Sequence, residues 1–212
     1  MKKLILILFT TILYNTTFSQ KVVISVFHQN CLIANLDNAL EIIAENVPFD
    51  SLVVKTNNGQ LVKGINFYSI RPKELGNAKI SVFKIKNRDT ILISEKYFKV
   101  INLERYTYAS IADKHDGDTI SKGLLLAQKI INSIIVDLDI DLHAPVSNYR
   151  IIMLHNDSLI FTKQFESNKI EPELLEKFQL LQTGDVIYFV DILCLTPDNK
   201  KMKIKPVKLT IK

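Results

Sequence analysis

Short runs of alternating apolar and polar residues, separated by turn-forming residues, dominate the first half of the chain. In Val22–Val26 every second residue is a large apolar one, which is the two-residue period of a half-buried strand. Similar runs follow at residues 39–43, 51–55, 60–63, 67–70, 79–86 and 90–94, with Phe98 and Val100 completing the set. About seven short strands joined by turns rich in Asn, Asp and Gly predict a β-sandwich of immunoglobulin-like type over residues 20–103.

The second half, residues 104–212, predicts a mixed but still β-rich domain with one helix. A polar stretch at residues 104–118 is typical of a boundary or a long loop, and a short helical turn follows at residues 121–127. The alternating run at residues 131–142 predicts a half-buried strand. One helix begins at Pro172 and is expected to end at Gly184. The other expected elements are a hairpin at residues 149–163 and strands at residues 186–195, 202–204 and 207–211.

The first twenty residues have the three parts of a secretory signal peptide. Lys2 and Lys3 form a basic start, residues 4–13 are mostly apolar, and residues 17–19 place small side chains at the −3 and −1 positions of a cut before Gln20. The apolar run is about half of the ~20 residues that a membrane-spanning helix needs. We therefore predict a cleaved signal peptide at residues 1–19 and a periplasmic or secreted protein that is not an integral membrane protein.

Composition and charge exclude several classes of protein. The 212 residues are 47% hydrophobic and 23% charged, which is a globular composition. The net charge of +5 falls to +3 without Lys2 and Lys3, so a strong nucleic-acid binder is disfavoured. Two cysteines exclude a disulfide framework. Cys194 has the strand parity of a buried thiol, while a bond between Cys31 and Cys194 is left open by their spacing.

No residue pattern predicts a catalytic, cofactor-binding or metal-binding site, so we expect neither an enzyme nor a cofactor. Three aspartates alternate along the run at residues 131–142, where a solvent-facing strand surface is favoured over a calcium site: Asp137, Asp139 and Asp141. Three others lack the glutamate that closes an EF-hand and indicate a turn: Asp113, Asp116 and Asp118. The four histidines have no zinc-ligand spacing: His28, His115, His143 and His155. Neither a nucleophile elbow nor a glycine-rich phosphate loop is present.

Six lysines near the C-terminus form the strongest charge cluster: Lys200, Lys201, Lys203, Lys205, Lys208 and Lys212. One interpretation is docking to an acidic partner or to an anionic envelope surface. The other is that lysines on an outer face prevent edge-to-edge pairing of strands. Apolar residues interleave with these lysines as a packed strand requires, which favours the second interpretation.

Several short motifs, taken in order, resemble the C-terminal periplasmic domains of the gliding-motility GldM and PorM family. In the second half they are the runs at residues 117–122, 136–142, 181–192 and 196–201. In the first half they are the runs at residues 37–42, 56–61, 66–72 and 97–100. The resemblance covers nearly all of the chain after the predicted signal peptide, and it departs from the family pattern at Ala39, Asn199 and residues 87–89.

The resemblance implies an exported, non-catalytic protein-interaction module that binds envelope proteins, among them components of gliding motility or type IX secretion. Full-length members of the family begin with a membrane helix and a long helical region, whereas this chain is expected to start directly at the immunoglobulin-like domain. We therefore do not expect it to span the periplasm by itself. The alternative function is a cell-surface β-sandwich that binds a glycan or another small ligand. Such sites usually use exposed aromatic side chains, and the chain has no Trp.

Overall fold

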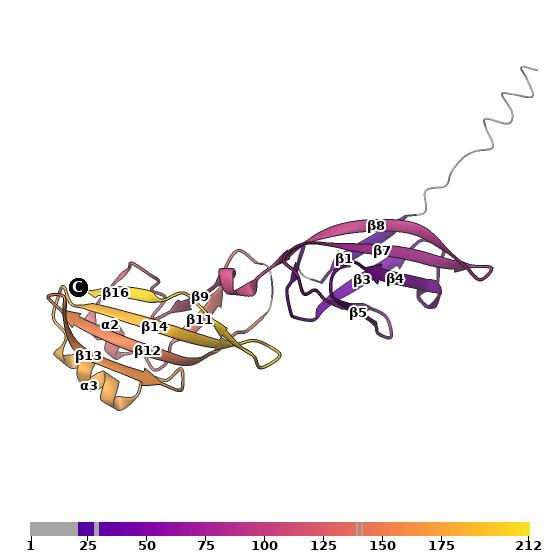
Figure 1. Ribbon diagram of the computed structural model, residues 1–212. Helices are drawn as coiled ribbons and strands as arrows, with labels where there is room; N and C mark the ends of the chain where they lie inside the picture. Colours follow the sequence, from indigo (N-terminus) through magenta and orange to yellow (C-terminus); the bar gives the residue numbers. More distant parts are fainter. Residues whose placement is uncertain (1–20, 28–29, 139, 141) are drawn as a thin grey trace, which may run out of the picture.

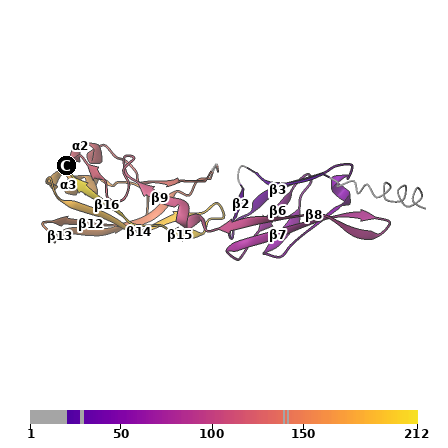
Figure 2. The ribbon, with the colours of Figure 1, turned by 90° about the horizontal axis from the view of Figure 1, so that it is seen from above.

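The computed structural model describes residues 21–27, 30–138, 140 and 142–212, which form two β-rich bodies lying end to end (Figures 1 and 2). The predicted signal peptide at residues 1–19 lies outside the described residues. One set of buried side chains runs from Ile24 to Val100 and another from Ala109 to Ile211. The mainly β fold class is confirmed, while the domain limits at residues 20–103 and 104–212 stay predictions.

The first body is a sandwich of two four-stranded sheets. One sheet has the strand order β1 (Val22–Val26), β3 (Asn38–Ala44), β6 (Tyr68–Arg71) and β5 (Gln60–Lys63). The other has the order β2 (Cys31–Ile33), β8 (Asp89–Ile101), β7 (Gly76–Lys86) and β4 (Leu52–Thr56), with the short helix η1 (Phe49–Ser51) before β4. Strand β2 runs parallel to β8 and the other paired strands are antiparallel. This division of strands between two sheets is that of the immunoglobulin fold.

Alternation along the strands builds the core between these sheets. In β3 the even-numbered residues are buried and the odd-numbered ones are not, and Ala78, Ile80 and Val82 of β7 face them. Tyr68 is buried as well, and its hydroxyl donates to the carbonyl oxygen of Leu52 at 3.0 Å. The hydroxyl of this buried Tyr side chain thus has a hydrogen-bond partner in the opposite sheet.

The second body is built on one larger sheet. Its order is β10 (Thr119–Ile120), β16 (Val207–Ile211), β14 (Val186–Leu195), β12 (Val146–His155) and β13 (Ser158–Phe165), with β15 (Lys201–Lys203) also paired to β14. The helices α2 (Lys122–Leu126) and α3 (Pro172–Leu180) pack on one face of this sheet (Figure 2). A separate ribbon of β9 (Thr107–Ser110) and β11 (Asn132–Ile135) lies on the same side, and η2 (Leu103–Tyr106) joins the bodies.

Tight turns explain both long hairpins. Asn156 and Asp157, between β12 and β13, have φ of 46° and 61°, and Asn87 and Arg88, between β7 and β8, have φ of 53° and 73°. Two consecutive residues of positive φ form the type I′ turn that matches the twist of a hairpin. Asn and Asp tolerate this conformation well, and the turn lies within the hairpin predicted at residues 149–163.

Four expectations about secondary structure were wrong. The strand predicted over residues 131–142 ends at Ile135, because Asp137 takes a φ of 59° and leaves the extended conformation. Residues 104–118, expected to be a boundary or a long loop, include most of η2 between the two bodies, but also the strand β9, which pairs with β11 and was not expected. Helix α3 ends at Leu180 rather than at Gly184. The short strands β2 and β10 were missed because two or three residues show no period.

A buried amide fixes the turn between β2 and β3. The side-chain oxygen of Asn38 accepts the backbone N–H of Ile33 at 2.7 Å. Its Nδ2 lies 2.8–3.2 Å from three carbonyl oxygens, those of Ile33, Leu36 and Ile70. Asn38 therefore holds the turn that carries Leu36 and Asp37 against strand β6.

Replacing Asn38 by Ala should destabilise the first domain by about 2–3 kcal/mol, because buried backbone groups lose their partners. Urea unfolding followed by circular dichroism measures this loss. Asn77→Ala, at an exposed position of β7, is the matched control and should change the free energy of unfolding little. Equal effects of the two substitutions would contradict the role of the buried amide.

Candidate functional site: the junction between the domains

A small apolar cluster, here called the junction cluster, lies between the two domains. Its buried members lie at the end of β2, in the turn after it, at the end of β8 and at the start of η2: Ile33, Leu36, Ile101 and Leu103. The second domain contributes partly buried residues that pack against them: Tyr106, Ile135, Leu138, Ile140, Leu142 and Met202. The domains are therefore held together by apolar contact as well as by the connecting chain.

The junction cluster accounts for the misleading alternation at residues 131–142. Leu138, Ile140 and Leu142 do alternate with aspartates, but they pack against the first domain instead of forming a strand of the second. Asp139 and Asp141 lie outside the described residues, so the predicted row of carboxylates is not described beyond Asp137. Alternation shows only that one side of a segment is covered, and the covering surface here belongs to the other domain.

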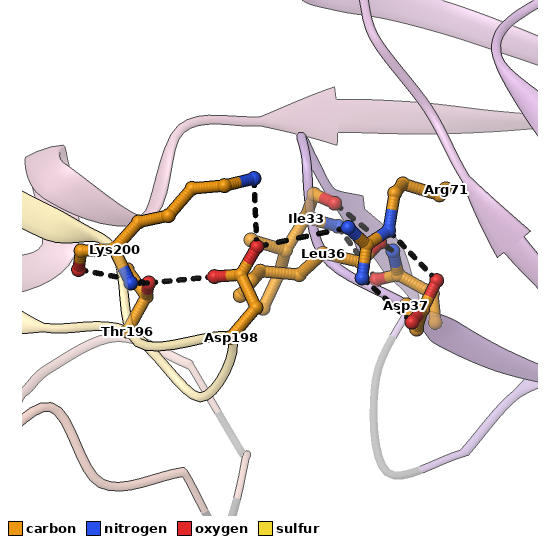
Figure 3. A network of polar contacts seen from close by, with 8 residues as sticks. Ile33, Leu36, Asp37, Arg71, Thr196, Asp198 and Lys200 are labelled. Carbon is orange, nitrogen blue, oxygen red and sulfur yellow. Dashed lines mark hydrogen bonds and ion pairs between the residues drawn. The ribbon is translucent and has the colours of Figure 1, made fainter.

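Arg71, at the end of β6, joins carboxylates of both domains (Figure 3). Its Nε and Nη2 donate to Asp37 Oδ1 and Oδ2 at 2.9 and 2.7 Å, a bidentate pair within the first domain. Its Nη1 lies 3.6 Å from Asp198 Oδ2, which belongs to the turn between β14 and β15. The guanidinium group is suited to this bridging position because its donors lie in one plane and diverge.

The turn at residues 196–200 holds Asp198 in place. The Thr196 hydroxyl donates to Asp198 Oδ1 at 2.7 Å and accepts the N–H of Lys200 at 3.1 Å. The Lys200 ammonium lies 2.9 Å from Asp198 Oδ2, so this oxygen is shared by two cations (Figure 3). Asn199 has a φ of 59°, a left-handed conformation that Asn tolerates better than most residues.

These contacts lower the pKa of both carboxyl groups. For Asp37 the main cause is the hydrogen bond from Arg71, and for Asp198 it is the hydrogen bond from Lys200, followed by that from Thr196. The pKa of Arg71 is raised by Asp37. At neutral pH the three groups are therefore all charged, and the bridge between the domains is complete.

A cavity of about 490 Å³ opens beside this bridge. It is lined by residues of both domains: Leu36, Asp37, Arg71, Leu142, His143, Pro197 and Asp198. A second cavity of about 240 Å³ shares Leu36 and Asp198 with it and extends along β15. In the larger cavity, Arg71 forms ion pairs with both Asp37 and Asp198, so these charged groups link the two domains.

The other residues singled out in the sequence lie apart. His143 borders the junction, whereas His155 Nδ1 lies 2.7 Å from the buried carboxylate of Asp185 in the second domain, and His28 is outside the described residues. Asp118 accepts the backbone N–H of His115, as expected for a turn, whereas Asp116 accepts that of Lys208 in β16. Over the described ranges no group of three or more His, Cys, Asp or Glu side chains is placed to hold a metal ion. In the same ranges no helix is long and apolar enough to cross a membrane.

The C-terminal lysines have several different environments. Lys200 and Lys203 pair with Asp198 and Asp191, and Lys205 and Lys208 lie over the rings of Tyr108 and Tyr188. Strand β16 has neighbours on both sides, β14 and β10, whereas β15 pairs only with β14 among the described strands. Edge protection by lysine therefore applies to β15 and not to β16.

The two cysteines lie one in each domain, and neither forms a disulfide bond. Cys194 is fully buried, as its strand parity indicated. Burial raises the pKa of both thiols, that of Cys194 to about 11. The described structure thus contains no bond between Cys31 and Cys194.

Sequence reasoning missed the residues of the bridge. Asp37 and Arg71 are 34 positions apart and Asp198 follows in another domain, so no spacing connects them. The one usable signal was local: Thr196 and Asp198 belong to a turn in which the hydroxyl accepts a backbone N–H and donates to the carboxylate.

Comparisons with known proteins give no assignment. No family model matches the chain, and no curated protein matches it. The adhesin InvE of Yersinia pseudotuberculosis aligns over 93% of this chain at 10% identity and a TM-score of 0.31. This chain spans 61% of that adhesin chain. The tandem Ig repeats of Dlar align over 91% of this chain and 97% of theirs, at 10% identity and a TM-score of 0.28. Such weak likenesses support no argument about function.

Replacing Arg71 by Ala should widen the range of relative domain positions, because the bridge between Asp37 and Asp198 is lost. Small-angle X-ray scattering of the full chain measures this. Arg150→Ala is the control, since Arg150 forms an exposed ion pair with Asp191 inside the second domain. If both variants scatter like the wild type, the bridge does not set the domain arrangement.

Lowering the pH should widen the range of relative domain positions, as Arg71→Ala is expected to do. Both carboxyl groups have folded-state pKa values below their ordinary 3.8, so the ion pairs stabilise the junction above that value. This stabilisation is lost as the pH falls through the lower folded-state pKa. We expect constant scattering from pH 8 to 5 and loosening only below about pH 4. A change near pH 6 would point to a histidine instead.

Proposed function

We propose that the chain is an exported protein-interaction module similar to the C-terminal periplasmic domains of the GldM and PorM family, which binds envelope proteins without a cofactor. The observation that carries the proposal is the junction, where Arg71 and the junction cluster hold two β domains in one arrangement. A fixed arrangement lets surfaces of both domains meet one partner at the same time, and this lowers the entropy lost on binding.

Exposed strand edges supply surfaces suited to protein contact. Strand β13 is the outermost strand of the large sheet, and Leu159 and Ile160 on it are 60% and 49% exposed. Leu180, at the end of α3, is 69% exposed. Apolar side chains along an unpaired edge favour the addition of a strand from another protein.

The test is affinity capture from envelope extracts of the source organism with the tagged chain, residues 20–212, as bait. We expect recovery of components of gliding motility or type IX secretion under mild conditions. Bait carrying Arg71→Ala should recover less if both domains must meet the partner together. An unrelated exported β-sandwich with the same tag is the control. Failure of the wild-type bait to enrich any such component would contradict the proposal.

A second candidate function, binding of a glycan or another small ligand, is favoured by the polar lining of the junction cavity. Carboxylates and a guanidinium group can hydrogen-bond to sugar hydroxyls. Aromatic residues are absent from the lining of this cavity, which counts against a sugar site. A glycan array decides the matter: a binder whose signal is lost in Asp198→Ala would favour this function, and an array without any binder would exclude it.

A further inference from the structure

Strands β7 and β8 continue beyond the sandwich as a two-stranded arm, residues 83–92. It projects from the end of the first domain that faces away from the junction (Figure 1). Its strands pair from Phe83 opposite Leu92 to Lys86 opposite Asp89. Strand β4 accompanies β7 only as far as Leu52, opposite Lys84. The last part of the arm therefore has no flanking strand among the described residues.

One side of β8 is open along this arm. The neighbour of β8 on that side, β2, pairs only with Lys99, Val100 and Ile101. Over residues 89–94 no described strand pairs with this side, so a row of backbone donors and acceptors faces outward. Such an edge is a template for a further strand.

The side chains of the arm combine apolar and basic character. Ile85, Ile91 and Leu92 are 49%, 42% and 49% exposed. Leu92 pairs with Phe83 and Ile91 with Lys84, so these two neighbours point to opposite faces of the ribbon. Lys84, Lys86 and Arg88 against Asp89 give the arm a net charge of +2. An occupant that complements this arm is acidic and has apolar side chains of its own.

A lipid surface fits this arrangement poorly. The tip consists of residues 86–89, three of them charged, and the apolar side chains lie behind it. Entering a bilayer tip first would place those charges in hydrocarbon before the apolar residues arrive, which is costly. Lying flat would cover only one of the two apolar faces. A protein segment alongside the edge meets both the open backbone and the basic groups.

We propose that the arm docks an acidic, extended segment of a partner protein, which adds as a strand to the open side of β8 over residues 89–94. This inference deepens the proposed function and rests on it. Main-chain hydrogen bonds supply affinity, apolar side chains on one face of the segment contact Leu92, and carboxylates on its other face meet Lys86, with Arg88 at the turn beyond. The junction then sets how the second domain lies relative to the docked partner.

The experiment uses the full chain after residue 19 and a fluorescent octapeptide of alternating valine and glutamate. Fluorescence anisotropy should report binding that weakens as salt is added. Two charge reversals, Lys86→Glu with Arg88→Glu, should weaken it at least about tenfold, because like charges then face each other. The same peptide with every second amide N-methylated should not bind, since strand pairing is blocked. Circular dichroism confirms that each variant is folded.

The matched control is Lys201→Glu with Lys212→Glu, which reverses two exposed lysines in the second domain and should leave binding unchanged. Equal affinity of the arm variant and the wild type would overturn the proposal, as would equal binding of the methylated peptide. No binding of the unmodified peptide below about 1 mM would do the same. Sedimentation with phosphatidylcholine vesicles containing phosphatidylglycerol, if it depended on Lys86 and Arg88 while the peptide did not bind, would assign the arm to lipid instead.

Affinity capture separates the two proposals. If the variant Lys86→Glu with Arg88→Glu recovers the same envelope proteins as the wild type, the docking role proposed for the arm is wrong and the proposed function stands. If the wild type recovers none, the proposed function fails whatever the peptide does. Loss of a captured protein in the arm variant, but not in the lysine control, supports both.

Discussion

The arrangement of the two domains depends on one guanidinium group set beside a small apolar cluster. Arg71 reaches Asp37 of its own domain and Asp198 of the other, beside the junction cluster. Exposed ion pairs contribute little to stability because water screens them, so the apolar contact supplies most of the free energy. The ion pairs are directional, so they favour one relative orientation of the two domains among those that would bury a similar apolar area.

The core of the first domain supports this junction. Asn38 belongs to the buried face of β3, yet its amide group binds the backbone of the turn that presents Leu36 and Asp37. Arg71 is the last residue of β6, which pairs with β3. The position of the bridge is thus set by the same strand pairing that forms the sandwich. A polar group inside an apolar core requires partners, and here those partners are the backbone atoms of the junction.

The two ends of the first domain have different chemistry. At the junction, opposite charges neutralise one another and apolar side chains are covered by the second domain. At the arm, basic side chains and exposed isoleucine and leucine lie beside an open strand edge. The junction end of the first domain is therefore covered by the second domain, while the arm end exposes the surface at which we place a partner.

The amino-acid pattern was sufficient for most of the local structure. The two-residue period located most strands of both domains, Pro172 located the start of the helix, and the buried state of Cys194 followed from its parity. These features depend on neighbours along the chain, which a pattern contains. The strand predicted over residues 131–142 was wrong because Leu138 and Leu142 alternate toward the other domain.

Which distant residues meet is set by the tertiary fold. Asp37, Arg71 and Asp198 become one bridge because β3 pairs with β6 and because the turn after β14 lies against the first domain. Likewise, among the described strands β2 pairs with β8 only at Lys99, Val100 and Ile101, and no sequence pattern indicates where that pairing ends. Charge and polarity are visible in a sequence. Which residue a charged group contacts far along the chain is set by the packing of the strands and of the two domains.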